Sequence, residues 1–221
     1  MCGRFTLLAK EDEIRKRFAI DYMAESVEVR YNIAPTQRVF VVLFDGEKKR
    51  GGYIQWGLVP SWAKDPSFAS NLINARVETA HEKPSFRSLL VRRRCLVIAD
   101  SFYEWQAKEK ADKVVHRIQV KGESLFAFAG LWDKWENGEE MLFTCTMLTK
   151  GANEFMRPIH HRMPIILPKE KEDDWLTQPF TQPIEAQQFL TALDDPDLQS
   201  YEVSTYVNHP KHDDEACIQP L

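Results

Sequence analysis

Short apolar segments separated by turn signals are the feature that most constrains what this chain can fold into. Apolar runs of about three to eight residues between turns are typical of strands. Asp45-Gly46 and Lys121-Gly122 favour tight hairpin turns. The predicted strands are residues 39–44, 53–59, 95–99, 114–120, 125–131, 141–148, 163–167 and 201–203.

Only a few segments have helical character. In residues 10–18, Ile14 and Phe18 share one face and charged residues fill the rest. The other predicted helices or helical turns are residues 84–90, 153–156, 169–176 and 184–193. No repeat or Pro/Gly/Ser-rich linker divides the chain, so we expect one α+β domain over residues 1–221. Its sheet should be curved, barrel-like and mostly antiparallel, and the polar tail from about residue 208 should be irregular.

The composition is that of an ordinary globular protein, with 43% hydrophobic residues and a net charge of −4. No stretch of about 18 apolar residues exists, and Leu7-Leu8-Ala9 runs directly into charged residues, unlike a signal-peptide core. We therefore expect a cytoplasmic protein with no membrane partner. Nothing in the sequence requires more than a monomer.

The four cysteines are Cys2, Cys95, Cys145 and Cys217, and no two of them form a Cys-x-x-Cys pair. Zinc sites and disulfide frameworks depend on characteristic cysteine spacings. We therefore predict no metal and no cofactor. Cys95 and Cys145 lie in apolar runs, which indicates buried small side chains.

A net charge of −4 argues against binding nucleic acid with the whole surface, but it leaves a local basic groove open. The basic residues are clustered. The clusters are Lys48-Lys49-Arg50, Arg87 and Arg92-Arg93-Arg94. A solvated loop or helix end explains such clusters too, and it is the favoured interpretation for residues 48–50, which lie at a turn.

Cys2 follows the initiator methionine and precedes Gly3. Once Met1 is removed, Cys2 would carry a thiol and a free α-amine, which both titrate not far above neutral pH. This aminothiol can attack an acyl group, with the amine as base. Alternatively, it can add to an aldehyde through both groups and close a thiazolidine ring. The position alone also permits an ordinary small residue near a terminus.

Residues 71–78 combine polar and apolar side chains. If they are extended, Asn74, Arg76 and Glu78 share one face and form a row of amide, guanidinium and carboxylate groups. An edge strand with one solvated face explains the pattern equally well.

Glu104 stands between Tyr103 and Trp105. Among aromatic rings its carboxyl would have a raised pKa and could act as a general acid or base. Strand alternation alone favours the opposite arrangement, in which Glu104 is exposed and the rings point inward.

Two histidines and an arginine, His160, His161 and Arg162, lie between Pro158 and Pro164. Histidine titrates near neutral pH, and arginine binds phosphate through two hydrogen bonds. Adjacent histidines of a strand point to opposite faces, and no third ligand is close in sequence, which argues against a metal site.

Trp56 and Trp62 flank a segment with one glycine and one proline. They could form an aromatic shelf on which unpaired bases stack. Alternatively, both belong to the core.

The order of these segments is more specific than any one of them, because it resembles the SRAP family of SOS-response-associated peptidases, or abasic-site-processing proteins. The resemblance covers residues 1–164. It rests on Met1-Cys2-Gly3-Arg4-Phe5, Tyr31-Asn32-Ile33-Ala34-Pro35, Trp56-Gly57-Leu58-Val59-Pro60-x-Trp62, Asn74-Ala75-Arg76-Val77-Glu78-Thr79, Phe102-Tyr103-Glu104-Trp105 and His160-x-Arg162-Met163-Pro164.

The resemblance implies an abasic-site sensor of the DNA damage response that binds single-stranded DNA. Cys2 would form a covalent thiazolidine with the ring-opened deoxyribose and so shield the lesion. Asn74, Glu104 and His160 match positions that surround the sugar, with Glu104 as acid and base and His160 as stabiliser. The resemblance also implies lyase-type chemistry, reversal of the cross-link and self-removal of Met1.

The same resemblance implies that Arg4, Arg76 and Arg162 hold the DNA backbone. The tryptophans are the candidates for base stacking. His161 falls at a variable place in its motif, so it receives no role.

Two alternatives remain. An N-terminal-nucleophile amidohydrolase, such as a glutamine amidotransferase-like enzyme, would also begin with Cys2-Gly3, although no clear glutamine-pocket motif is present. A non-catalytic single-strand-binding module would use the tryptophans and arginines, and its behaviour towards DNA would not depend on Cys2.

Overall fold

The computed structural model describes residues 2–108 and 113–221. The strands in these two ranges are β1 (Phe5–Leu7), β2 (Tyr22–Met23), β3 (Arg30–Ile33), β4 (Arg38–Phe44), β5 (Lys49–Trp56), β6 (Asn74–Arg76), β7 (Arg94–Ala99), β8 (Ser101–Ala107), β9 (Lys113–Val120), β10 (Phe126–Asn137), β11 (Glu140–Gly151), β12 (Arg162–Pro164), β13 (Ile166–Leu167) and β14 (Leu198–Val203). The helices are α1 (Glu11–Arg17), α2 (Val77–Ala80), α3 (Arg87–Arg92), α4 (Glu172–Thr177) and α5 (Pro183–Thr191), with 3₁₀ turns η1 (Pro66–Asn71), η2 (Lys169–Lys171), η3 (Thr205–Asn208) and η4 (Glu215–Ile218).

Five strands close into a barrel. They pair in the order β11-β10-β7-β4-β5, and β5 pairs back to β11 in parallel while the other pairings are antiparallel. The β7 strand is buried along its whole length, which explains the unbroken apolar run from Cys95 to Ala99. Gly130 allows β10 to approach β7, because a Cβ there would lie 2.6 Å from the Sγ of Cys95. The predicted α+β fold with a barrel-like, mostly antiparallel sheet is confirmed.

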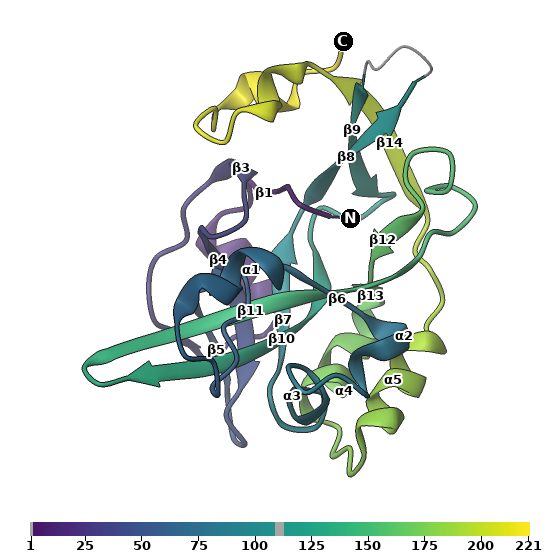
Figure 1. Ribbon diagram of the computed structural model, residues 1–221. Helices are drawn as coiled ribbons and strands as arrows, with labels where there is room; N and C mark the ends of the chain where they lie inside the picture. The colour runs from purple at the N-terminus through teal and green to yellow at the C-terminus, as the bar shows by residue number, and fades with distance from the viewer. Residues whose placement is uncertain (1, 109–112) are drawn as a thin grey trace.

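A second sheet has the order β14-β9-β8-β1-β3 and lies above the barrel in Figure 1. It includes β1, which pairs with both β8 and β3 through Phe5. Asp100 accepts hydrogen bonds from the hydroxyl of Thr6 and the amide of Leu8. These bonds fix β1, and with it the N-terminal segment, beside β8.

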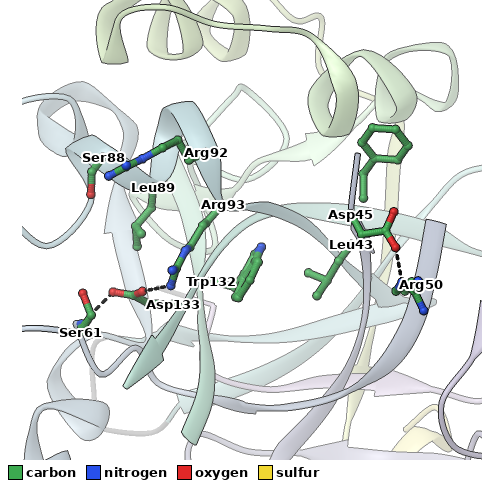
Figure 2. Close-up of a pocket in the computed structure, with 11 residues that line it drawn as sticks. Leu43, Asp45, Arg50, Ser61, Ser88, Leu89, Arg92, Arg93, Trp132 and Asp133 are labelled. Carbon is green, nitrogen blue, oxygen red and sulfur yellow. Dashed lines mark hydrogen bonds and ion pairs between the residues drawn. The ribbon is translucent and has the colours of Figure 1, made fainter. Parts of the chain in front are cut away.

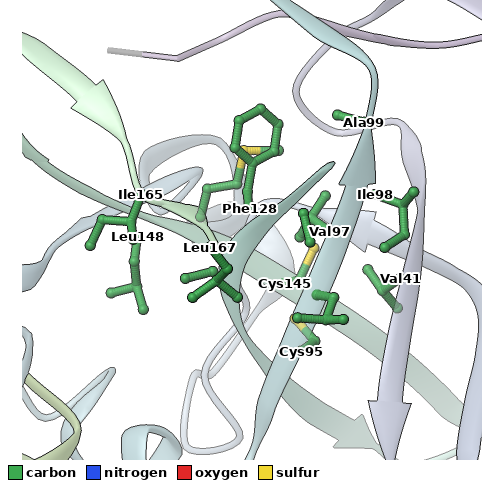
Figure 3. Packing of buried hydrophobic residues seen from close by; sticks show 14 of the residues in the cluster. Val41, Cys95, Val97, Ile98, Ala99, Phe128, Cys145, Leu148, Ile165 and Leu167 are labelled. Carbon is green, nitrogen blue, oxygen red and sulfur yellow. The ribbon is translucent and has the colours of Figure 1, made fainter. Parts of the chain in front are cut away.

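The main core fills the barrel and extends to β1 and the helices. Figure 3 shows Val97, Cys95 and Cys145 lying together in it, with Phe128 nearby. Both side chains are fully buried, as predicted, and neither forms a disulfide. Burial raises the pKa of each thiol, so both behave as small apolar side chains.

Most predicted elements are confirmed, but two differ in an informative way. The strand predicted at 53–59 ends at Trp56, because Gly57 adopts a φ of 119° and a Cβ there would lie 2.3 Å from the carbonyl oxygen of Ala69. The segment 71–78 is extended only over β6 and then turns into α2. Asn74, Arg76 and Glu78 therefore do not share a strand face.

The C-terminal tail is held against the second sheet. The side chain of Asp213 accepts hydrogen bonds from the amides of Tyr31 and Asn32 and pairs with Arg30. Pro220 forms an isolated bridge with Val203. No helix in the described ranges is long and apolar enough to cross a membrane.

Candidate active site

Cys2 is fully buried where β1 meets β8. Phe5 pairs with Phe102, and the amide of Tyr103 donates to the carbonyl oxygen of Arg4 at 2.9 Å. Continuing this antiparallel register brings the Cys2-Gly3 segment alongside Glu104. The carbonyl oxygen of Cys2 accepts a hydrogen bond from the side-chain nitrogen Nδ2 of Asn74, at 2.8 Å.

Glu104 is only 2% exposed and lies close enough to Cys2 to affect its titration. Burial raises the pKa of the Cys2 thiol, and the negative charge of Glu104 raises it further. The exposed Glu104 favoured by strand alternation is therefore wrong. Both faces of β8 are covered, since Tyr103 packs into a separate small cluster with Val115 and Val203.

Asn74 reaches Cys2 from the barrel side. Its strand β6 pairs in parallel with β11, so that Asn74 lies opposite Met147 and Arg76 lies opposite Thr149. The Oδ1 atom of Asn74 is buried, and no hydrogen-bond partner for it occurs among the described residues. One polar atom of the amide thus holds Cys2, while the other is available for a ligand.

His160 lies two residues before β12, which flanks the same β11 strand. The amide of Arg162 donates to Nδ1 of His160 at 2.9 Å. Nδ1 also lies 3.1 Å from the carbonyl oxygen of Arg162. In the neutral tautomer that accepts from the amide, the ring proton is on Nε2. The expectation that the two histidines point to opposite faces is wrong. They precede the strand, and their rings stack at 4.4 Å between centroids.

Gln106 joins the strand of Glu104 to the loop of His160. Its side-chain nitrogen donates to the carbonyl oxygen of Pro158 at 2.9 Å, and its Oε1 lies 3.1 Å from Nε2 of His116. Sequence reasoning missed Gln106. Its one signal is its place two residues after Glu104, on the same face of β8.

The three candidate arginines have different surroundings. Arg76 is exposed, and the described residues offer it no hydrogen bond or ion pair. Arg162 is buried and forms two hydrogen bonds with the carboxylate of Glu78, at 2.6 and 2.9 Å, and one with the carbonyl oxygen of Thr149. The neighbouring His160 lowers the pKa of His161 most, and desolvation and the charges of Arg162 and Arg76 lower it further.

Arg4 is half-buried and already bonded. Its Nη1 donates to Oδ1 of Asn32 at 2.8 Å and to the carbonyl oxygen of Val207 at 2.7 Å, and its guanidinium lies over the ring of Trp105. Asn32 is fully buried and also donates to the carbonyl oxygen of His212. Sequence analysis gave Asn32 no role, although a buried amide in a β-strand signals a specific partner.

The tryptophan shelf is wrong for Trp56. That ring is fully buried, packs edge-on against Phe5, and donates from Nε1 to the carbonyl oxygen of Ile73 at 2.9 Å. Trp62 is 56% exposed on the loop that follows β5. The core interpretation is therefore confirmed for Trp56, and Trp62 alone offers a ring to a ligand.

Together, these residues supply a thiol, a carboxyl and an amide in a sheltered position, with the exposed cation of Arg76 two residues after Asn74. This set suits covalent capture of an electrophilic carbon that carries anionic neighbours. No group of three or more candidate metal ligands occurs in the described part of the chain.

A protein family, named relatives and solved structures each match most of this chain. The family of "SOS response associated peptidase (SRAP)" matches residues 1–210. The "Abasic site processing protein YoqW" of Bacillus subtilis is 45% identical over 222 residues, which is 99% of each chain. The "Abasic site processing protein HMCES" of Xenopus tropicalis is 28% identical over 267 residues and matches 100% of this chain and 78% of its own. A crystal structure from Bacteroides thetaiotaomicron has a TM-score of 0.85 at 25% identity, covering 100% of both chains.

Proposed function

Because the chain belongs to the SRAP family, we propose that it captures abasic sites in single-stranded DNA through a covalent bond to Cys2. The protein would shield the lesion in this form and release it by the reverse reaction. Relatives named for abasic-site processing support the substrate. The observation that carries the proposal is the buried Cys2 held between Asn74 and Glu104.

The reaction begins with removal of Met1, which the protein would perform on itself and which frees the α-amine of Cys2. An abasic deoxyribose is mainly a closed hemiacetal, so its ring must open first. The proton of the C1′ hydroxyl leaves, the C1′–O4′ bond breaks, and O4′ receives a proton. Glu104 is placed to give and take these protons, a role that depends on a positioned carboxyl group.

Capture then uses both groups of Cys2. The amine adds to the C1′ aldehyde and loses water, which gives an imine. The thiol adds across the C=N bond, sulfur bonding to C1′ while the nitrogen gains a proton, so the net loss is one water molecule. Because its pKa is raised, the thiol is neutral before the reaction. Glu104 can accept its proton as the C–S bond forms.

The surrounding residues would position the DNA. The free Oδ1 of Asn74 and Nε2–H of His160 can bind the oxygens of the opened sugar. Arg76 is free to contact a phosphate, and Trp62 offers a ring to an unpaired base. Arg4 and Arg162 would reach the backbone only by sharing their present partners.

The test is a denaturing gel of protein incubated with a uracil-glycosylase-treated oligonucleotide. Wild type should give a shifted band without any reductant. Cys2→Ser keeps the amine and removes the thiol, so it should give a band only when borohydride traps the imine. A residue inserted before Cys2 should abolish the band.

The matched control is an oligonucleotide whose abasic aldehyde has been reduced to the alcohol, which should give no band. A wild-type protein that forms no band at any salt concentration would refute the proposal. An equal, reductant-independent band for Cys2→Ser would exclude the thiazolidine.

A further inference from the structure

Two of the basic clusters in the sequence meet at one place in the fold. Leu43 of β4 pairs with Arg50 of β5 on one side and with Cys95 of β7 on the other. Neighbouring strands lie about 4.8 Å apart, so this register brings Arg50 near the residues that precede Cys95. Arg92 and Arg93 occupy those positions, at the end of α3.

These residues line an open pocket of about 510 Å³, drawn in Figure 2. Its wall is formed by α3, by the ends of β4 and β5 that meet at their turn, by the middle of β10, and by the loop after β5. The lining residues are Leu43, Phe44, Asp45, Arg50, Ser61, Ser88, Leu89, Arg92, Arg93, Trp132 and Asp133. Three arginines and two aspartates leave it a net positive charge in a chain whose net charge is −4.

The three arginines of the pocket differ in the side-chain partners that they already have. Arg50 pairs with Asp45, and Arg93 pairs with the buried Asp133. Arg92 is exposed, and it has no hydrogen bond or ion pair with any residue that the structure describes. In Figure 2 its side chain extends toward the hydroxyl of Ser88. An uncommitted guanidinium beside a hydroxyl is a good anchor for a phosphate oxygen.

The pocket also offers a flat apolar surface. Trp132 is partly buried and lies between Arg93 and Leu43 in Figure 2. The guanidinium of Arg93 lies 5.0 Å from the centre of its ring. A pocket with one free cation and a ring close by matches a ligand that carries a phosphate next to a planar base. Its volume is in the range of small-ligand sites.

We propose that this pocket binds a nucleotide, with the phosphate on Arg92 and the base beside Trp132. It is separate from Cys2, because β7 runs from Arg94 at the pocket to Ala99 near β8, a span of about 17 Å. The nucleotide is either free or part of a DNA strand that flanks the lesion. The choice of a nucleic-acid ligand rests on the proposed function.

The experiment uses the full chain and DNA without a lesion, so Cys2 chemistry does not contribute. The indole N–H signal of Trp132, assigned by its loss in Trp132→Phe, is followed by NMR in two arms. One arm adds dAMP and the other adds a 30-nucleotide single strand. A shift with dAMP identifies a free nucleotide, and a shift with the oligonucleotide alone identifies a flanking strand.

Arg92→Ala is the test variant, and Arg87→Ala is its control, since Arg87 is exposed on the same helix but does not line the pocket. Arg92→Ala should weaken binding in the responding arm by about fivefold. If that arm is the oligonucleotide, it should also reduce the slope of log affinity against log salt by about one. Arg87→Ala should have a smaller effect. Ser88→Phe, which fills the pocket, should remove the Trp132 shift.

Absence of the shift in both arms would overturn the inference, as would equal effects of Arg92→Ala and Arg87→Ala. A shift caused by an acidic peptide but by neither nucleotide ligand would overturn it as well. The covalent assay keeps the two proposals distinct. A protein that cross-links abasic DNA but has an inert pocket refutes only this inference, and a binding pocket without cross-linking refutes only the proposed function.

Discussion

The side chain of Gln106 donates a hydrogen bond to the carbonyl oxygen of Pro158, 2.9 Å away. This bond connects β8, which carries Glu104, to the loop that carries His160. Glu104 and His160 are 56 residues apart in the sequence. Their relative position therefore depends on such cross-links.

Gln106→Ala should therefore disturb the position of His160 relative to Glu104. We expect cross-link formation about tenfold slower, with the same adduct and little change in stability, because a partly exposed side chain loses only its hydrogen bonds to Pro158 and His116. Single-turnover gels give the rate, and hydrogen exchange of the His160 amide reports the loop. Gln119→Ala on β9 is the control. Equal exchange in wild type and Gln106→Ala would contradict the idea.

Glu104→Gln should slow both formation and reversal of the cross-link, by about 10²-fold or more, because the amide cannot exchange protons in the same way. The change preserves shape in a site that is only 2% exposed. Glu202→Gln, an exposed change on β14, serves as the control. Unchanged rates in both directions would remove Glu104 from the chemistry.

The stability of the region around Gln106 should depend on pH through His116. Burial lowers the pKa of His116 below its usual value, so the folded protein holds fewer protons than the unfolded chain just below that value. The stability that neutral His116 contributes is therefore fully present above the pKa of this histidine in the unfolded chain. It is lost as the pH falls through the lower pKa of the same histidine in the folded protein. Urea denaturation at pH 7.5 and pH 5 should show a larger loss for wild type than for His116→Gln. Equal losses would contradict the prediction.

Much of the fold follows from local patterns, because apolar runs end at turn residues such as Gly46 and Gly122. The hairpin predicted at Lys121-Gly122 is wrong, because this turn joins β9 of the second sheet to β10 of the barrel and the two strands do not pair. The end of β5 could not be predicted in this way. Gly57 stops the strand through a close approach to Ala69, a contact between segments that the sequence does not place together.

The candidate site, like the fold, could be predicted from the sequence only in part. The motifs named Cys2, Asn74 and Glu104, but alternation predicted an exposed Glu104, because it cannot indicate that β8 is covered on both faces. Likewise, a tryptophan on a polar loop and one in the core look alike in sequence. The partners of Trp56 are distant in the chain.

The two tryptophans should separate stability from DNA binding. Trp56→Ala should destabilise the fold by about 3–5 kcal/mol, because it leaves a cavity in the core and removes the hydrogen bond from the indole to the carbonyl oxygen of Ile73. Trp62→Ala should leave stability unchanged and weaken binding of single-stranded DNA by about 1–3 kcal/mol. Denaturation and fluorescence anisotropy measure the two effects. Normal DNA affinity in Trp62→Ala would exclude base stacking on that ring.

Arg76 and Arg162 should behave differently although both lie on strands that pair with β11. Arg76→Ala removes an exposed cation, so DNA binding should lose about one unit of its log–log salt slope while stability is retained. Arg162→Ala removes the partner of Glu78 and the bonds to Thr149, and should therefore lower both stability and the cross-linking rate. Arg162→Lys, which keeps the charge but loses the paired geometry with Glu78, should not restore the rate. If Arg162→Lys restored the rate fully, charge alone would account for Arg162, and the paired hydrogen bonds to Glu78 would have no part in it.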